Sequence, residues 1–386
     1  MNEQRIETNE SPHIMIPACT GQVVVKSWLQ TAVSIQGASF TVEQDSAIHI
    51  TSQGDLFLAV PEQTSVSLGV IGGDVTLKHL AGGMTGDNLQ GNVVLNNLDA
   101  VQIDQVGQAL TAENLNGTLT VKQVGGAVSL QRVSEIMLGS VKGSAVIEYA
   151  NGPVELHRLE GSLSLKSING DVMVANALSD VVLQNLGGSN TFPSVNGDIW
   201  LVGGLRAGEQ LFVSERTVYV YWPDDAPLHL FANAPQIDNF VPLENENRRE
   251  EGDQIILTGH IEEGKTSLTL KSAQRIAMKP LGSAEPQFLP DEFMVPEEPA
   301  GDLAQKVRTA VHAVLTESAE MVGLEERLVT AVVAALAEMG ETAVPSEPSA
   351  NLYIVESTES RTHILELVRD GLISIKQADV LLEALT

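Results

Sequence analysis

Five aspartates in the middle of the chain could supply the acid groups of a carbohydrate-cleaving site. Such chemistry needs two carboxylates, or a carboxylate and a basic side chain, that converge on one groove. Most of these aspartates lie in turn-like sequences, where a carboxylate accepts hydrogen bonds from turn amides. We therefore interpret them as corner residues and expect no enzymatic activity. The aspartates are Asp74, Asp87, Asp171, Asp180 and Asp198, and the basic side chains that could partner them are Lys78, Lys122, Arg132, Arg158 and Lys166.

The histidines and the single cysteine predict no metal site. The 8 histidines are scattered without a pair at ligand spacing, and Cys19 is the one cysteine. Zinc sites need clustered Cys and His ligands. The turn Gly72-Gly73-Asp74 is similar to calcium-binding repeat turns, but nearly all other units lack the glycine and aspartate that such turns need. Within the nine-residue repeats no corner continues as Gly-Lys-Ser or Gly-Lys-Thr, so we expect neither a phosphate loop nor a cofactor.

The chain is acidic and long enough for two or three domains. It has 386 residues and a formal net charge of −28, which disfavours binding to nucleic acid and unaided docking on anionic lipid. One cysteine allows no intrachain disulfide, which is consistent with a reducing compartment. The opening residues are polar and acidic, unlike a secretion signal, and no apolar run is long enough for a direct membrane span. We therefore expect a cytoplasmic protein.

A nine-residue period of apolar residues decides the fold prediction. Most steps are nine residues, and two are eight, from Leu98 to Val106 and from Val133 to Val141. Repeats this short are supersecondary units that bury their apolar face only by stacking on one another. The recurring residues are Leu80, Leu89, Leu98, Val106, Leu115, Val124, Val133, Val141, Ala150, Leu159, Ile168, Ala177, Leu186 and Val195.

Within each unit the apolar residues alternate, as in Val154 and Leu156, which is the period of a strand. Pairs such as Asn116-Gly117 and Asn169-Gly170 separate the units, and we expect them to form sharp corners, because glycine and asparagine tolerate positive φ. The predicted fold class is mostly β: a single-chain β-solenoid (parallel β-helix) of about nine-residue units with β caps, followed by C-terminal α-helices. The eight-residue steps favour two units per coil, and hence coils of 17 to 18 residues. Three units per coil and an antiparallel meander are the alternatives, and handedness is not predicted.

Composition shifts divide the chain into segments. Residues 1–20 are predicted as a flexible leader and residues 21–281 as the solenoid with its caps, with regular repeats at about 72–204. A polar loop, residues 244–253, is expected within the second cap. The remaining predictions are an acidic, proline-rich linker at 282–301, amphipathic helices at 302–340, a second linker at 341–358 and a helical hairpin at 359–386.

The terminal hairpin is the predicted interaction site. Asp370-Gly371 ends its first helix, and Ser374 with Gln377 has capping-box spacing for the second. So short a segment cannot bury enough apolar surface to be stable alone, so it needs a partner surface in the same chain or in another. We expect a protein partner, or self-association, through these C-terminal helices. The apolar residues of the hairpin are Ile364, Leu365, Val368, Leu372, Ile373, Leu381, Leu382 and Leu385.

Three sequence motifs resemble those of the bacterial "putative adhesin" β-solenoid family of unknown function: Gly73-Asp74-Val75, Asn169 to Val172, and the strand Asp55 to Pro61. The resemblance covers about residues 21–281, and the hairpin Ile364 to Leu385 is similar to a SHOCT-like helical domain. The resemblance implies a non-enzymatic scaffold or protein–protein interaction protein, with some relatives linked to cell-envelope stress or regulation. Family members often carry transmembrane or regulatory segments, which we do not find in this sequence.

Two other functions remain open. A self-assembling structural filament of the bactofilin kind would stack solenoids end to end. The strands that flank the repeats do not follow the nine-residue period, which counts against the open ends that such stacking needs. A carbohydrate-binding or carbohydrate-cleaving β-helix would need exposed aromatic side chains. The tryptophans are Trp28, Trp200 and Trp222, and they form no regular series in the sequence.

Overall fold

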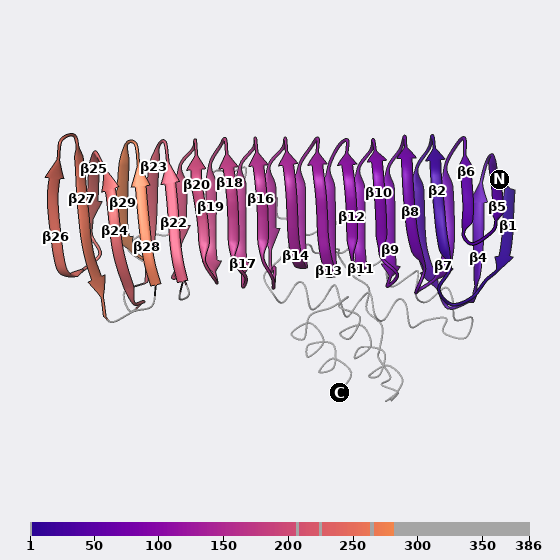
Figure 1. The fold of residues 1–386 in the computed structure, drawn as a ribbon, viewed down its shortest axis with the longest axis horizontal. Helices are drawn as coiled ribbons and strands as arrows, with labels where there is room; N and C mark the ends of the chain where they lie inside the picture. The colour runs from indigo at the N-terminus through magenta and orange to yellow at the C-terminus, as the bar shows by residue number, and fades with distance from the viewer. Residues whose placement is uncertain (1, 206–207, 224–225, 263–265, 282–386) are drawn as a thin grey trace, which may run out of the picture. The chain divides into compact units, whose positions relative to one another are not determined.

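The computed structural model describes residues 2–205, 208–223, 226–262 and 266–281, and these form 29 β-strands and no helix (Figure 1). The prediction of a strand-rich repeat fold is confirmed. The predicted linkers and C-terminal helices, from residue 282 onward, lie outside the described residues.

Most strands belong to two parallel ladders, and β13 (Leu110–Val124) and β14 (Val128–Val141) contribute to both. In spatial order, ladder A contains β6 (Ile48–Ser52), β2 (His13–Cys19), β8 (Ser65–Ile71), β10 (Met84–Leu89), β12 (Val101–Val106), the second parts of β13 and β14, β16 (Val154–Leu159), β18 (Val172–Ala177), β20 (Asn190–Val195), β22 (Gly208–Ser214), β28 (Thr266–Ser272) and β24 (Leu228–Ala234). Ladder B contains β7 (Leu56–Pro61), β3 (Val23–Trp28), β9 (Val75–Leu80), β11 (Val93–Leu98), the first parts of β13 and β14, β15 (Ala145–Glu148), β17 (Leu163–Ile168), β19 (Val181–Leu186), β21 (Ile199–Val202), β23 (Thr217–Trp222), β29 (Arg275–Pro280) and β25 (Gln236–Asn239).

Strand partners lie two units apart in the sequence. In ladder B, Val93 pairs with Val75 on one side and with Leu110 on the other, which are steps of 18 and 17 residues. In ladder A, Val101 pairs with Met84 and Leu119, which are steps of 17 and 18. One coil, defined here as one strand of each ladder with its corners, therefore has the length that the eight-residue steps predict. The antiparallel meander is wrong for this stretch.

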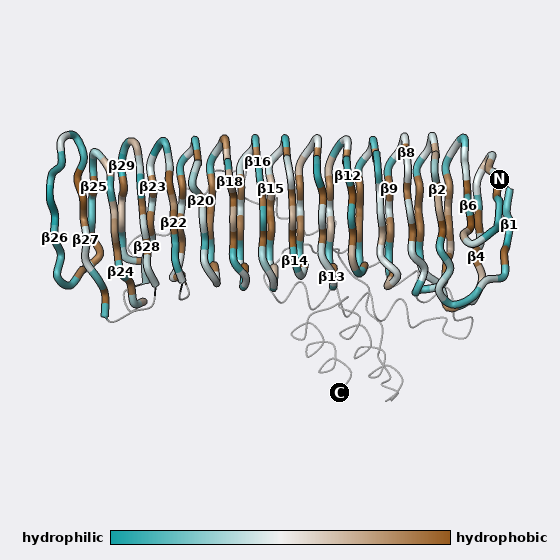
Figure 2. The backbone as a smooth tube through the Cα atoms, viewed as in Figure 1, coloured by the Kyte–Doolittle hydropathy of each residue, from teal (hydrophilic) through white to brown (hydrophobic). Residues whose placement is uncertain are grey.

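Alternate residues of each strand point inward and make a continuous aliphatic core. In β16, Val154, Leu156 and Leu159 are at most 2% exposed. Leu165 of β17 is also fully buried, and its register partners in the neighbouring coils are Ile147 and Leu183. Figure 2 shows the same pattern as brown and teal segments that alternate along the strands. Burial of these apolar rows stabilises the stack by about 25 cal/mol per Å².

Stacking, and not φ, requires glycine at the corners Gly117 and Gly170. Neither Gly117 nor Gly170, which follow asparagine at predicted corners, has positive φ. A Cβ on Gly170 would lie 2.3 Å from the carbonyl carbon and oxygen of Gly152 in the neighbouring coil. These two glycines therefore do not use the tolerance of positive φ, and the backbone of the neighbouring coil is what excludes a side chain.

From β9 to β21, the chain instead adopts positive φ at the fifth residue counted from the start of each ladder B strand. His79 follows this rule in β9 with φ 59°, and Asn97 in β11 with φ 53°. Left-handed backbone costs a non-glycine residue roughly 1–2 kcal/mol, so the stacking of successive coils must impose this bend. The series continues with Asn114, Arg132, Tyr149, Ser167, Asn185 and Gly203.

Antiparallel strands close both ends of the ladders. At the N-terminal end, β4 (Ala32–Gly37) pairs with β7, β1 (Asn2–Glu7) pairs with β4, and β5 (Phe40–Gln44) pairs with β6. At the other end, β27 (Gln254–Ile261) pairs with β24, and β26 (Glu244–Glu251) pairs with β27. The polar loop predicted at 244–253 is therefore mostly a strand, which is exposed along its whole length.

The coils near each end are out of sequence order. Residues 1–20 are not a leader, because β2 lies between β6 and β8, and its Ile14 and Ile16 are fully buried. At the other end, β28 lies between β22 and β24. Each end thus contains a coil inserted between the outermost coil and the rest of the stack.

Candidate interaction surface

The hairpin predicted as the interaction site lies outside the described residues, so its role stays a prediction. The residues concerned are Ile364, Leu365, Val368, Leu372, Ile373, Leu381, Leu382 and Leu385. The described part of the chain contains no helix able to cross a membrane. It also contains no group of three or more His, Cys, Asp and Glu side chains placed to hold a metal ion.

The aspartates that could have done chemistry bind backbone instead. Asp74 Oδ1 accepts a hydrogen bond from the amide of Asn92 at 2.8 Å, one coil further on. Asp180 Oδ1 accepts from the amide of Asp198 at 2.9 Å, and Asp198 Oδ1 accepts from Thr217 at 2.9 Å. Asp171 does the same with the amide of the next coil. The interpretation of these four as corner residues is confirmed, and their carboxylates tie successive coils together. For Asp87 the interpretation is wrong, because this residue lies within β10.

Several of the predicted basic partners form exposed ion pairs along the ladders. Lys122 Nζ lies 2.8 Å from Asp104, and Arg132 lies 3.1 Å from Glu113. Solvated pairs of this kind contribute about 0–1 kcal/mol each. They do not converge with the corner aspartates on one groove.

One outward-facing register of ladder B carries no formal charge from β7 to β29. Two of its members, Val182 and Ala277, are nevertheless buried, at 1% and 4% exposed. We define the outer row as the first outward-facing register of ladder B, in which Val94 pairs with Thr76 and with Thr111. It begins at β7 and ends at β29, and it is bordered by Gln36 on one side and Asp238 on the other. Its members are Phe57, Val24, Thr76, Val94, Thr111, Ser129, Val146, Ser164, Val182, Trp200, Tyr219 and Ala277.

A polar row lies two residues further along the same strands. Asn96 Nδ2 donates to Glu113 at 3.2 Å, and Gln131 Nε2 donates to Glu148 at 3.5 Å. Lys166 Nζ lies 3.9 Å from Glu148. Neighbouring coils therefore present complementary groups in this stretch, which fixes the register and leaves the outer row beside an ordered polar border.

Aromatic side chains gather at the C-terminal end of the outer row. Trp200 and Tyr219 stack with ring centroids 5.6 Å apart and an interplanar angle of 12°. Tyr221, two residues beyond Tyr219, is buried, and this burial together with the nearby Tyr219 raises the pKa of its phenol. This pair could not be predicted from the sequence, because Trp200 and Tyr219 become neighbours only when the coils are aligned.

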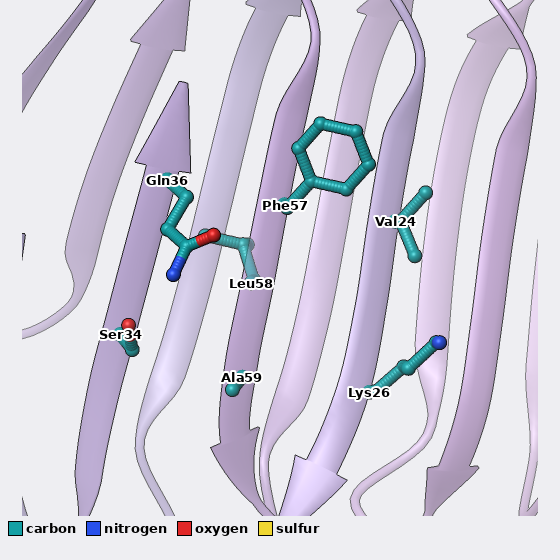
Figure 3. A pocket seen from close by; sticks show the side chains of 7 residues that line it. All are labelled: Val24, Lys26, Ser34, Gln36, Phe57, Leu58 and Ala59. Carbon is teal, nitrogen blue, oxygen red and sulfur yellow. The ribbon is translucent and has the colours of Figure 1, made fainter. Parts of the chain in front are cut away.

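A shallow hollow lies at the N-terminal end of the same face (Figure 3). Its volume is about 200 Å³. Phe57, Val24 and Lys26 lie on one side of it, and Gln36 and Ser34 on the other. Ser34 and Gln36 both donate to Glu3 on β1, at 3.5 Å and 3.4 Å. The complete lining is Val24, Lys26, Ser34, Gln36, Phe57, Leu58 and Ala59.

Cys19 lies in the core and takes no part in this surface. The residue is 2% exposed, and its Sγ lies 3.2 Å from the carbonyl oxygen of Gly54. Burial raises the pKa of the Cys19 thiol above its usual value. The thiol is therefore protonated at neutral pH and a poor nucleophile.

Comparison with known proteins adds little to this geometry. No family model matches the sequence, and no curated protein matches it. A match among solved structures is the crystal structure of a putative cell adhesion protein from Clostridium sporogenes, at 11% sequence identity. The match covers 72% of this chain and 99% of that chain, with a TM-score of 0.14. So low a TM-score supports no conclusion about the fold or the function of this chain.

Proposed function

We propose that this protein is a non-enzymatic scaffold, a protein–protein interaction protein built on a β-solenoid. Its contact surface is the outer row. The observation that carries the proposal is the absence of formal charge from this row, from Phe57 to Ala277, in a chain of net charge −28. The cores of protein interfaces are depleted in charge and enriched in aromatic residues, as the row is at Trp200 and Tyr219.

The rigidity of the wall supports the same role. Backbone hydrogen bonds to both neighbouring strands hold each member of the row in place, and the side chains are short, branched or aromatic, with few rotatable bonds. A partner that binds such a wall orders few flexible side chains, which lowers the entropic cost of association. In this proposal the C-terminal helices supply a second docking element or a means of self-association, and any link to cell-envelope stress depends on the family resemblance.

The alternative of a bactofilin-like filament is less well supported. The edge strand β26 carries Glu244, Arg248 and Glu251 among its exposed side chains, and β1 carries Glu3 and Arg5. Charged edge strands oppose edge-to-edge pairing between copies. Filaments built by end-to-end stacking would need these ends to be plain.

Carbohydrate binding has one observation in its favour. The stacked pair Trp200 and Tyr219 offers apolar ring area on an outward face, as a sugar ring requires. Gel electrophoresis through soluble polysaccharides would test it: retardation of the wild type that Trp200→Ala abolishes would favour this second function, and unchanged mobility in every polysaccharide would rule against it.

Charge insertion into the outer row tests the scaffold proposal. The double variant Ser129→Glu, Ser164→Glu places two carboxylates in the row at side chains that are not part of the core. Its matched control, Gln102→Glu with Met173→Glu, adds the same charge to exposed positions of ladder A. Each protein serves as bait in a lysate of the source cells, with quantitative mass spectrometry as the readout.

The expected result is that a discrete protein set binds the wild type and the control but is lost from the row variant. Thermal melting confirms that all three baits are folded. Equal capture by the row variant and the control would refute the outer row as the contact surface.

A further inference from the structure

Two lysines stand side by side at the N-terminal end of ladder B. Lys26 of β3 and Lys78 of β9 are direct register partners on adjacent parallel strands. Like charges directly opposite each other destabilise a sheet. Neither ammonium has a carboxylate within 4.0 Å among the residues that the structure describes. The pair therefore has no stabilising counter-charge within this part of the chain.

Further along the polar row, by contrast, the register partners are complementary groups. Its next members pair an amide or an ammonium with a carboxylate, as in Asn96 with Glu113 and Lys166 with Glu148. Register alone thus does not force like charges together. The lysine pair is a local departure from complementarity, in a chain whose acidic residues outnumber its basic ones by 50 to 22.

The departure coincides with the hollow of Figure 3. Lys26 lines the hollow, and Val24, Phe57 and Ala59 give it an apolar part. At about 200 Å³ it is smaller than the roughly 300–1,000 Å³ of small-molecule sites. It suits one side chain of a protein better than a cofactor. Glu3, held by Ser34 and Gln36 on the far side, repels an anion there and favours one at the lysines.

We propose that the hollow receives an apolar side chain of a protein partner, and that a neighbouring carboxylate of the same segment bridges Lys26 and Lys78. The partner segment is thus an acidic peptide with an aromatic or aliphatic residue beside its acidic one. This inference rests on the proposed scaffold function and names the chemistry that one end of the outer row selects.

Lysine-specific NMR of the full chain tests the inference. Reductive methylation with ¹³C-formaldehyde labels each lysine and keeps its positive charge, and the Lys26→Gln and Lys78→Gln variants assign the two signals. The probe is a blocked peptide of one phenylalanine flanked by glutamates. The comparison peptides replace the glutamates by glutamines, or the phenylalanine by glycine.

Titration with the probe should shift both lysine signals. Either glutamine variant should weaken binding by about fivefold, which corresponds to about 1 kcal/mol, and each comparison peptide should lose at least as much. Lys122→Gln, which removes an ammonium paired with Asp104 on ladder A, should bind the probe as the wild type does. Added salt should weaken the binding, because the site is exposed.

Failure of this inference is distinguishable from failure of the scaffold function. Unshifted lysine signals, or equal binding of the glutamate and glutamine peptides, would overturn the lysine site. If Ser129→Glu with Ser164→Glu still abolished capture from lysate, the outer row would nevertheless stand as the contact surface.

Discussion

Replacing Gly170 by alanine separates the two reasons for which a glycine can occupy a corner. The added Cβ would lie 2.3 Å from the carbonyl carbon and oxygen of Gly152 and 2.6 Å from the nitrogen of Pro153. These are backbone atoms, so no rotamer change relieves the contact, and the neighbouring coil must move. Overpacking of this kind costs about 1–3 kcal/mol.

An account based on φ predicts instead that Gly170→Ala increases the stability of the protein. Gly170 does not have positive φ, so alanine is conformationally allowed there. The substitution would then stabilise the protein by about 0.4–1 kcal/mol, because it reduces the entropy of the unfolded chain. The stacking account instead predicts a net loss of about 1–2 kcal/mol after this gain is subtracted from the overpacking cost.

Two matched substitutions serve as controls in urea denaturation. At Gly54 the nearest atom to an added Cβ is that of Ala38, at 3.9 Å, so Gly54→Ala should be neutral or slightly stabilising. At Gly252 there is open space but φ is +63°, so Gly252→Ala should cost about 1 kcal/mol through the backbone alone. A Gly170→Ala protein as stable as Gly54→Ala would refute the stacking explanation.

Three further outcomes are expected. Leu165→Asp buries a carboxylate without a partner and should lower the free energy of unfolding by several kcal/mol, read from urea midpoints; an unchanged midpoint would remove Leu165 from the core. Asp180→Ala should cost about 1 kcal/mol in the same assay by freeing the amide of Asp198, whereas Asp87→Ala, for which we observe no such bond among the described residues, should change stability by less than about 0.5 kcal/mol. Burial raises the pKa of the Cys19 thiol, so its contribution to stability is present below the unfolded pKa of about 8.5 and is lost as the pH rises through the folded pKa. Thiol alkylation at pH 8 should accordingly be much slower in the native protein than in urea, and equal rates would contradict its burial.

The regular part of the fold was predictable because its signal is local and repeated. Alternation within units such as Val154 to Leu159 fixes the strand, and the eight-residue steps fix how many units make one coil. The positive φ at the fifth residue of the ladder B strands could not be predicted, because the residue type at this position varies, from Asn97 to Arg132 and Tyr149. Only the coil geometry that they share places them at equivalent positions.

The ends of the stack could not be predicted in the same way. The nearest partners of β2 come from β6 and β8, much later in the chain, so its buried Ile14 and Ile16 read as an isolated apolar pair in a polar leader. The strand β26 is exposed along its whole length because it lies at the edge of the sheet, beside β27. Its polar composition is therefore that of a loop, and a loop is what the sequence predicted. Prediction of both elements requires knowledge of what lies beside them.

The candidate surface depends on alignment between coils even more strongly. Phe57, Val24 and Thr76 are dispersed in the sequence and become consecutive members of the outer row only through the inserted coil. Lys26 and Lys78 are 52 residues apart and meet in the same way. The corner aspartates were interpreted correctly because the preference of Asp for turns is a property of the local sequence.

The inserted coils at the two ends also constrain how the protein is made and how it can change in length. During synthesis β2 and β3 must wait for β8 and β9 to emerge from the ribosome before they are enclosed on both sides, so the stack cannot grow simply from its first residue. Nor can β2 and β3 at one end, or β28 and β29 at the other, be removed as an outermost coil, since each of them lies between two other strands. Gain or loss of a whole coil is geometrically simple only in the middle of the stack. Evolution of longer or shorter forms should therefore alter the centre and leave both ends as they are.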